Sequence, residues 1–139
     1  MVGTMSKPAR PEYDTLTAQA TKLRLILGGT SYHTSIGSKV YVTPRPLNDP
    51  DDHIACIDVE INPRGRPYND KRIVLTWSAM VSWSGDDDAK PLNVLADMRS
   101  ALLCTDPKLP LAIDSARIHY PEPGGNYAIV LVVTSIHST

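Results

Sequence analysis

Residues 71–84 carry the most regular hydrophobic pattern in the chain. Apolar side chains alternate along one face of this segment: Ile73, Leu75, Trp77, Ala79, Val81 and Trp83. The positions between them are mostly polar or small: Arg72, Val74, Thr76, Ser78, Met80 and Ser82. A period of two residues is typical of a strand with one face in a core. The segment exceeds the usual strand length of about 3–10 residues, so we expect it to run beyond its own domain or to curve over a neighbour.

Two other segments repeat their apolar residues with the spacing of a helix. The first covers residues 11–27, and its stripe consists of Leu16, Ala20, Leu23 and Leu27. The second is expected to start at aspartates 86–88 and to end near Cys104, with a stripe of Leu92, Leu95, Met98 or Arg99, and Leu102. Gly28 and Gly29 favour the left-handed end of the first helix, and acidic residues suit the positive start of the second.

Four further segments have the composition of strands: residues 39–43, 53–61, 113–120 and 127–136. In the second of them the pattern places Ala55, Ile57, Val59 and Ile61 on one face. The last is almost continuously apolar, which indicates a central strand or one buried on both faces. The resulting order, α-β-β-β-α-β-β, predicts an α+β fold with an antiparallel or mixed sheet of four to five strands and two helices on one face. We expect residues 1–11 to be a flexible arm and 12–139 to be a single domain.

Composition narrows the class of protein. The chain has 139 residues, 42% of them hydrophobic, and a formal net charge of -1. A balanced charge argues against a general electrostatic grip on nucleic acid or on anionic lipid. Neither a signal peptide nor an apolar run of membrane-spanning length is present in the sequence, so we expect synthesis and assembly in the cytoplasm. Cys56 and Cys104 are expected to be buried free thiols of a reducing compartment, with a disulfide as the alternative.

The residue types that carry chemistry are present but do not form a recognisable site. The four histidines lack metal-ligand spacing, and Asp51, Asp52 and His53 are consecutive residues of a proline-rich loop. Aspartates 86–88 are explained by helix capping as well as by a cation. The glycine pairs lack the strand-glycine-helix order of a phosphate-binding loop. We therefore predict no catalytic residue, no metal site and no cofactor.

Two loops of opposite charge are the candidate contact sites. The basic residues are Arg64, Arg66, Lys71 and Arg72, with Tyr68 among them, and the acidic ones are Asp49, Asp51 and Asp52. These eight residues are candidate contacts with a neighbouring subunit or another partner. An acidic protein or a nucleic-acid backbone is an alternative partner for the basic loop, and a solvated turn is the simpler interpretation.

The order of elements resembles a known family of virion proteins. An amphipathic helix ends in Gly28-Gly29, a connector with Tyr32 and Gly37 leads to Val40-Tyr41-Val42, and a proline loop, a strand and the long strand follow. A second helix then ends in residues 98–103, Met-Arg-Ser-Ala-Leu-Leu, before a last strand pair. This architecture, over residues 12–137, resembles that of the tail terminators and related minor tail and head–tail joining proteins of long-tailed bacteriophages.

The resemblance implies a non-enzymatic structural protein at the tail–head junction of a virion. Its expected form is a homo-oligomeric ring, commonly a hexamer, which caps the tail tube, stops tube polymerisation and provides the surface for head joining. Expected partners are other copies of the chain, the tail tube protein and a head-completion or neck protein, with DNA only passing through the lumen and no membrane. In such a ring the strand 71–84 is expected to extend a neighbour's sheet or to form the wall. A head-closure or neck connector, and a small cytosolic enzyme or regulatory binding domain, are the alternatives.

Overall fold

The computed structural model describes residues 7, 8, 10–44, 51–61, 70–82, 89–104, 106–120 and 125–138. Its elements are α1 (Pro11–Leu23), the short 3-10 helix η1 (Ile36–Ser38), β1 (Val40–Tyr41), β2 (His53–Ile61), β3 (Asp70–Ser82), α2 (Lys90–Cys104), β4 (Leu111–His119) and β5 (Asn126–Ser138). The predicted α+β class and the order α-β-β-β-α-β-β are confirmed. The predicted start of the second helix at aspartates 86–88, and Trp83, lie outside the described residues.

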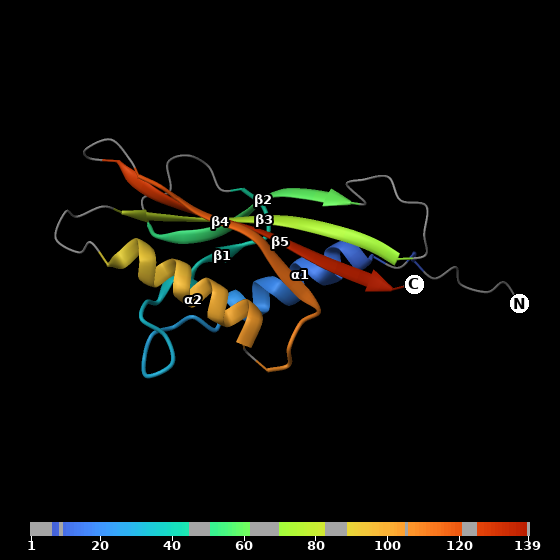
Figure 1. Cartoon of the computed structure of the whole chain (residues 1–139), viewed down its shortest axis with the longest axis horizontal. Helices are drawn as coiled ribbons and strands as arrows, with labels where there is room; N and C mark the ends of the chain where they lie inside the picture. The colour runs from blue at the N-terminus through green and yellow to red at the C-terminus, as the bar shows by residue number, and fades with distance from the viewer. Residues whose placement is uncertain are drawn as a thin grey trace, which may run out of the picture.

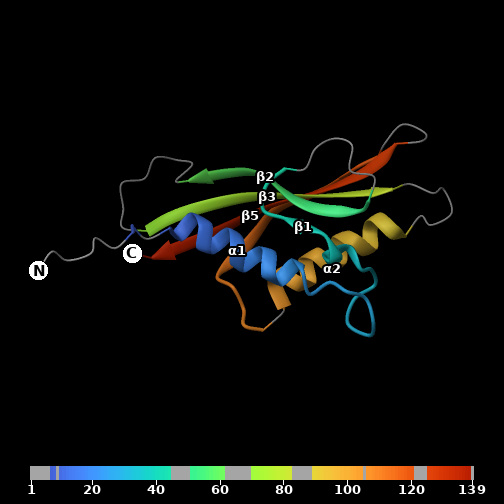
Figure 2. The ribbon, with the colours of Figure 1, turned by 180° about the vertical axis from the view of Figure 1, so that it is seen from behind.

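The strands form one five-stranded sheet in the order β1-β2-β3-β5-β4. β1 runs parallel to β2, and the other neighbours are antiparallel, so the sheet is mixed. Figures 1 and 2 show α1 and α2 on the same side of this sheet. We call the sheet face under the helices the inner face and the opposite one the outer face. The long hairpin of β4 and β5 agrees with the two C-terminal strands expected from the sequence.

β3 forms the centre of the sheet, and its period-two pattern is confirmed over the described residues. The buried inner side chains are Ile73, Leu75, Trp77, Ala79 and Val81, and their neighbours on β5 include Ile129, Leu131 and Val133. β3 pairs with β5 from Asp70 to Ser82 and with β2 from Ile73 to Met80. From Ile73 to Met80 both of its sides are paired, so this part of the strand has no free edge with which to extend a neighbour's sheet. The 13-residue length of β3 matches that of β5, with which it pairs from end to end.

α1 ends earlier than its hydrophobic stripe predicts. The helix stops at Leu23, where Leu25 N–H and Ile26 N–H bond to carbonyls three residues back, at 3.1 Å each. This tighter turn rotates Ile26 into the core, whereas Leu27 is 60% exposed. The predicted helical stop at Gly28 is therefore wrong. The left-handed conformation of the glycines at 28 and 29 is real, with φ of 76° at each, but it belongs to the following loop.

Of the predicted stripe of α2, Met98 and Leu102 are buried and Leu95 packs partly buried against the core, but the start of the stripe differs from the prediction. The buried residues of the helix are Pro91, Val94, Asp97, Met98, Ala101 and Leu102. Leu92 is 56% exposed, so it does not belong to the stripe. The helix does end at Cys104, as expected, and Pro91 lies in its first turn, where a missing N–H costs nothing.

A bulge in β2 overturns the predicted faces of that strand. The register shifts between Cys56 and Asp58. An extra residue reverses the alternation, so Ala55 pairs with Ser78 on the outer face, while Val59 pairs with Leu75 on the inner one. The sequence pattern, which placed Ala55 and Val59 on one face, is wrong at this point.

Candidate interaction surfaces

The acidic loop before β2 is held by ion pairs within the chain. Asp51 pairs with Lys39. Asp52 pairs with Lys90 at 2.9 Å and accepts a hydrogen bond from Ser82 N–H at 2.9 Å. Lys90 is the first residue of α2 and Ser82 is the last of β3, so Asp52 connects β2, β3 and α2 at one end of the sheet.

The environment of Asp52 alters its acidity. Partial burial by itself would raise the pKa of this carboxyl, but the hydrogen bond from Ser82 N–H and the charge of Lys90 outweigh that effect. The net result is a pKa below the ordinary aspartate value. Asp52 therefore stays ionised at neutral pH and acts as a structural brace.

A hollow of about 640 Å³ lies beside Asp52 and its partners, and its lining includes His33, Lys39 and Val94. Among its charged side chains, Asp51 and Asp52 already engage Lys39 and Lys90. The arrangement joins loops to the sheet, and Lys90 Nζ also lies 3.3 Å from the hydroxyl oxygen of Ser82. In the part of the chain that the structure describes, no group of three or more His, Cys, Asp or Glu residues is placed to hold a metal ion.

Asp97 is a buried charged residue with a structural role that the sequence did not reveal. It is 2% exposed on α2. Its carboxylate accepts hydrogen bonds from His33 N–H at 3.0 Å, from Thr34 N–H at 2.7 Å and from the Thr34 hydroxyl at 2.7 Å. The contacts span more than 60 residues of sequence, so only the buried position of Asp97 on the α2 stripe could have signalled them. They fasten the connector between α1 and β1 to α2.

Part of the basic loop lies outside the described residues. Arg64, Arg66, Tyr68 and Asp49 lie outside the described residues, and only the backbone of Lys71 is described. Arg72 lies on the outer face of β3, opposite Ile136 of β5. That position is at the end of β3 remote from Ser82, which Asp52 contacts. Within one chain the structure therefore does not bring Arg72 to the acidic residues.

The two edges of the sheet are surfaces that the sequence analysis did not identify. β4 forms one edge along its whole length, Leu111–His119. At the other edge β1 pairs only with Ile54 and Ala55, which leaves residues 56–61 of β2 without a further strand among the described residues. Along that free half of β2 three apolar side chains are largely exposed: Ile57 at 49%, Val59 at 44% and Ile61 at 45%.

The two cysteines are free, as predicted, but they differ in environment. Cys56 is buried, and burial raises the pKa of its thiol, which keeps it protonated. Cys104 is exposed at the end of α2, so the expectation of two buried thiols is wrong for this residue. Separately, none of the described helices is long and apolar enough to cross a membrane.

Comparison with known proteins gives a likeness of fold. No family model matches the sequence, and no curated protein matches it significantly. A chain of the solved structure described as the virion of a native gene transfer agent particle superposes with a TM-score of 0.67. The two chains are 14% identical, and the match covers 94% of this chain and 100% of the other. The chain therefore shares its fold with a protein of a gene transfer agent virion.

Proposed function

We propose that the chain is a structural protein of a phage-like virion and, within that class, a tail terminator. In this role copies of the chain form a ring on the end of the tail tube, stop its polymerisation and offer the surface to which the head joins. The observation that carries the proposal is the shared fold with a virion chain, which extends over 94% of this chain and the whole of the other. The terminator role comes from the resemblance in the order and length of the elements.

The arrangement of the sheet fits an assembly protein. Both helices cover the inner face, as Figure 2 shows, so the outer face and the two strand edges remain for contacts with other molecules. The described charged residues around the hollow are paired with one another. The working surfaces are therefore on the outside of the molecule.

The proposed partners follow from that role. They are other copies of the chain in a ring, most simply a hexamer, the tail tube protein and a head-completion or neck protein. DNA passes through the lumen. The ring assembles in the host cytoplasm and resides at the tail–head junction of the virion.

The oppositely charged loops remain proposed contacts between copies. Arg64, Arg66, Tyr68, Lys71 and Arg72 would form one side, and Asp49, Asp51 and Asp52 the other. Because Asp51 and Asp52 engage Lys39 and Lys90 in their own chain, a contact across copies must compete for the same carboxylates.

The deciding experiment is electron microscopy of particles made without this protein. Abnormally long tails without heads are the result expected for a terminator. Normal tails beside detached heads would replace that role with a neck function in the same virion. Correctly joined, infectious particles would overturn the proposal.

Light scattering of the purified chain, alone and with tail tube protein, tests ring formation directly. A ring in either sample is expected, and a monomer that also fails to bind the tube contradicts the proposal. A thermal-shift screen with metals and nucleotides covers the different class, a small enzyme or binding domain, because a ligand that binds the folded state raises the melting temperature.

A further inference from the structure

The two free edges of the sheet run in opposite directions. β2 is antiparallel to β3, β3 to β5 and β5 to β4. β4 is therefore antiparallel to β2. If a second copy is placed so that the sheet continues in the same sense, its β2 meets β4 of the first copy in the antiparallel orientation. Such a pair needs only the unpaired N–H and C=O groups that an edge strand presents.

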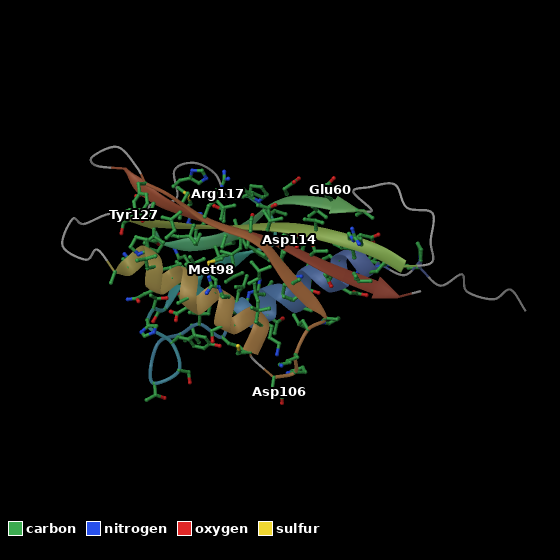
Figure 3. The ribbon with its side chains drawn as sticks, viewed as in Figure 1. Glu60, Met98, Asp106, Asp114, Arg117 and Tyr127 are labelled. Carbon is green, nitrogen blue, oxygen red and sulfur yellow. The ribbon has the colours of Figure 1, made fainter. Side chains whose placement is uncertain are left out.

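The side chains of the two edges have opposite charges on the outer face. On the free half of β2, Asp58 and Glu60 pair with outer-face residues of β3 and are exposed. On β4, Arg117 lies opposite Val130 of β5, also on the outer face, and is exposed. Figure 3 shows Glu60 and Arg117 on the side of the sheet away from the helices, on different strands.

Charge decides between the three ways in which two copies can join their edges. Two β2 edges place Asp58 and Glu60 near their own copies, and two β4 edges place Arg117 near its own copy. Directly opposed like charges destabilise a strand pair, whereas opposite charges stabilise it. Joining β4 to β2 sets Arg117 against two carboxylates, Asp58 and Glu60, whereas two β4 edges offer it only Asp114, whose carboxylate already accepts a hydrogen bond from Thr134 of its own chain. The interface between β4 and β2 is also heterologous, because a different surface of each copy takes part. Repeating it forms a closed ring when the rotation from each copy to the next adds up to a full turn.

We propose that β4 of one copy pairs antiparallel with residues 56–61 of β2 in the next copy, with Arg117 opposite Asp58 and diagonal to Glu60. This inference deepens the proposed function and rests on its ring. In this register Val59 of one copy covers Ala116 of the other, so part of the exposed apolar row is removed from water.

The register implies a stagger between copies. Within one chain, Ser115 is level with Asp58 through Val132 and Thr76. Placing Arg117 opposite Asp58 shifts the next copy by two residues, or about 7 Å along the strand. A sheet that closes on itself requires such a stagger. The Asp114 carboxylate, which would otherwise face the acidic edge, accepts a hydrogen bond from Thr134 of its own chain.

Charge reversal tests the contact. Arg117→Glu should weaken association about fivefold or more at each interface, because it replaces an attractive pair by a repulsive one. Asp58→Arg in the Arg117→Glu chain should restore the ring. Arg99→Glu is the matched control, since Arg99 is exposed on helix α2 and belongs to neither edge strand. Light scattering reports the mass, and circular dichroism checks that each variant is folded.

Disulfide trapping tests the register itself. In a chain with Cys104→Ser, the pair Asp58→Cys and Arg117→Cys should oxidise to a ladder of linked copies, because opposed residues of a strand pair lie about 4.5–5.5 Å apart between Cα atoms. Either single substitution should stop at the dimer or monomer. A wild-type ring that Arg117→Glu leaves intact, with no ladder from the double variant, overturns the edge pairing and leaves the terminator proposal standing. A wild-type chain that forms no ring and binds no tube overturns the terminator instead.

Discussion

The indole Nε1 of Trp77 donates a hydrogen bond to the side-chain Oε1 of Gln19, 2.9 Å away, and so joins the centre of β3 to α1 inside the core. Trp77 is 0% and Gln19 1% exposed. The other end of the amide, Nε2 of Gln19, is buried without a hydrogen-bond partner among the described atoms. Burying a side-chain amide with one unsatisfied donor costs free energy. The hydrogen bond from Trp77 offsets part of that cost, and without it both ends of the Gln19 amide would be buried without a partner.

Trp77→Phe should lower the free energy of unfolding by about 2–4 kcal/mol, since it leaves a cavity and removes the donor for Gln19. Urea denaturation measures the loss. Gln19→Leu should cost less in the Trp77→Phe chain than in the wild type, because the leucine then no longer strands the indole N–H. Equal costs in both backgrounds would show that the two side chains are not coupled.

Gly37 is required by packing, and Gly29 only by backbone conformation. A Cβ at Gly37 would lie 2.3 Å from the carbonyl oxygen of Leu23 and 2.7 Å from that of Ile26. Backbone atoms cannot yield as a side chain can, so Gly37→Ala should destabilise by about 3 kcal/mol or more. Gly29, with φ of +76° and open space around it, is the matched control. Gly29→Ala should cost about 1–2 kcal/mol from strain alone. Thermal melts that rank the two variants in the reverse order would contradict this account.

The sequence predicts the repeating parts of this fold better than its interruptions. The alternation from Ile73 to Val81 places β3 correctly, because one buried face demands a period of two. The β2 bulge between Cys56 and Asp58 and the tightened end of α1 at Leu23 each change the local period within one residue. Such changes are set by tertiary contacts, since Gly37 N–H bonds to Ile26 carbonyl at 2.8 Å only in the folded chain.

For the candidate surfaces, too, the sequence shows some features and only the folded chain shows others. Charge along the chain singles out Asp51 and Asp52, but it does not reveal Lys39 and Lys90 as their partners within the chain. The free half of β2 looks like an ordinary strand in the sequence. Its exposure follows from the shortness of β1, Val40–Tyr41, which is a property of the sheet and not of either segment alone.

Asp97 holds the connector by three hydrogen bonds, and its removal should release that segment. Asp97→Ala should destabilise the fold by about 2–3 kcal/mol, because it leaves two backbone N–H groups without their charged acceptor. Hydrogen exchange at His33 and Thr34 should accelerate markedly. Thr34→Val, which removes the hydroxyl bond and keeps both N–H contacts, should cost about 1 kcal/mol and leave the exchange of His33 nearly unchanged. Unaltered exchange in Asp97→Ala would show that the connector is held by other contacts.

Asp52 should make the stability of the chain fall in acid. Its pKa is lowered in the folded state, so its contribution is complete above the unfolded aspartate pKa, about 3.9, and is lost as the pH falls through the lower folded pKa. Asp52→Asn should therefore cost about 1 kcal/mol or less at pH 7, because the pair with Lys90 is only half-buried, and the difference from wild type should vanish near pH 2. Lys90→Gln keeps the hydrogen bond from Ser82 N–H to Asp52 but removes the positive charge. The folded pKa of Asp52 should then lie closer to the unfolded value, so the stabilisation by Asp52 should be lost over a narrower pH range. Chemical denaturation at a series of pH values measures both effects. A gap between wild type and Asp52→Asn that stays constant down to pH 2 would mean that the ionised carboxylate does not stabilise the fold.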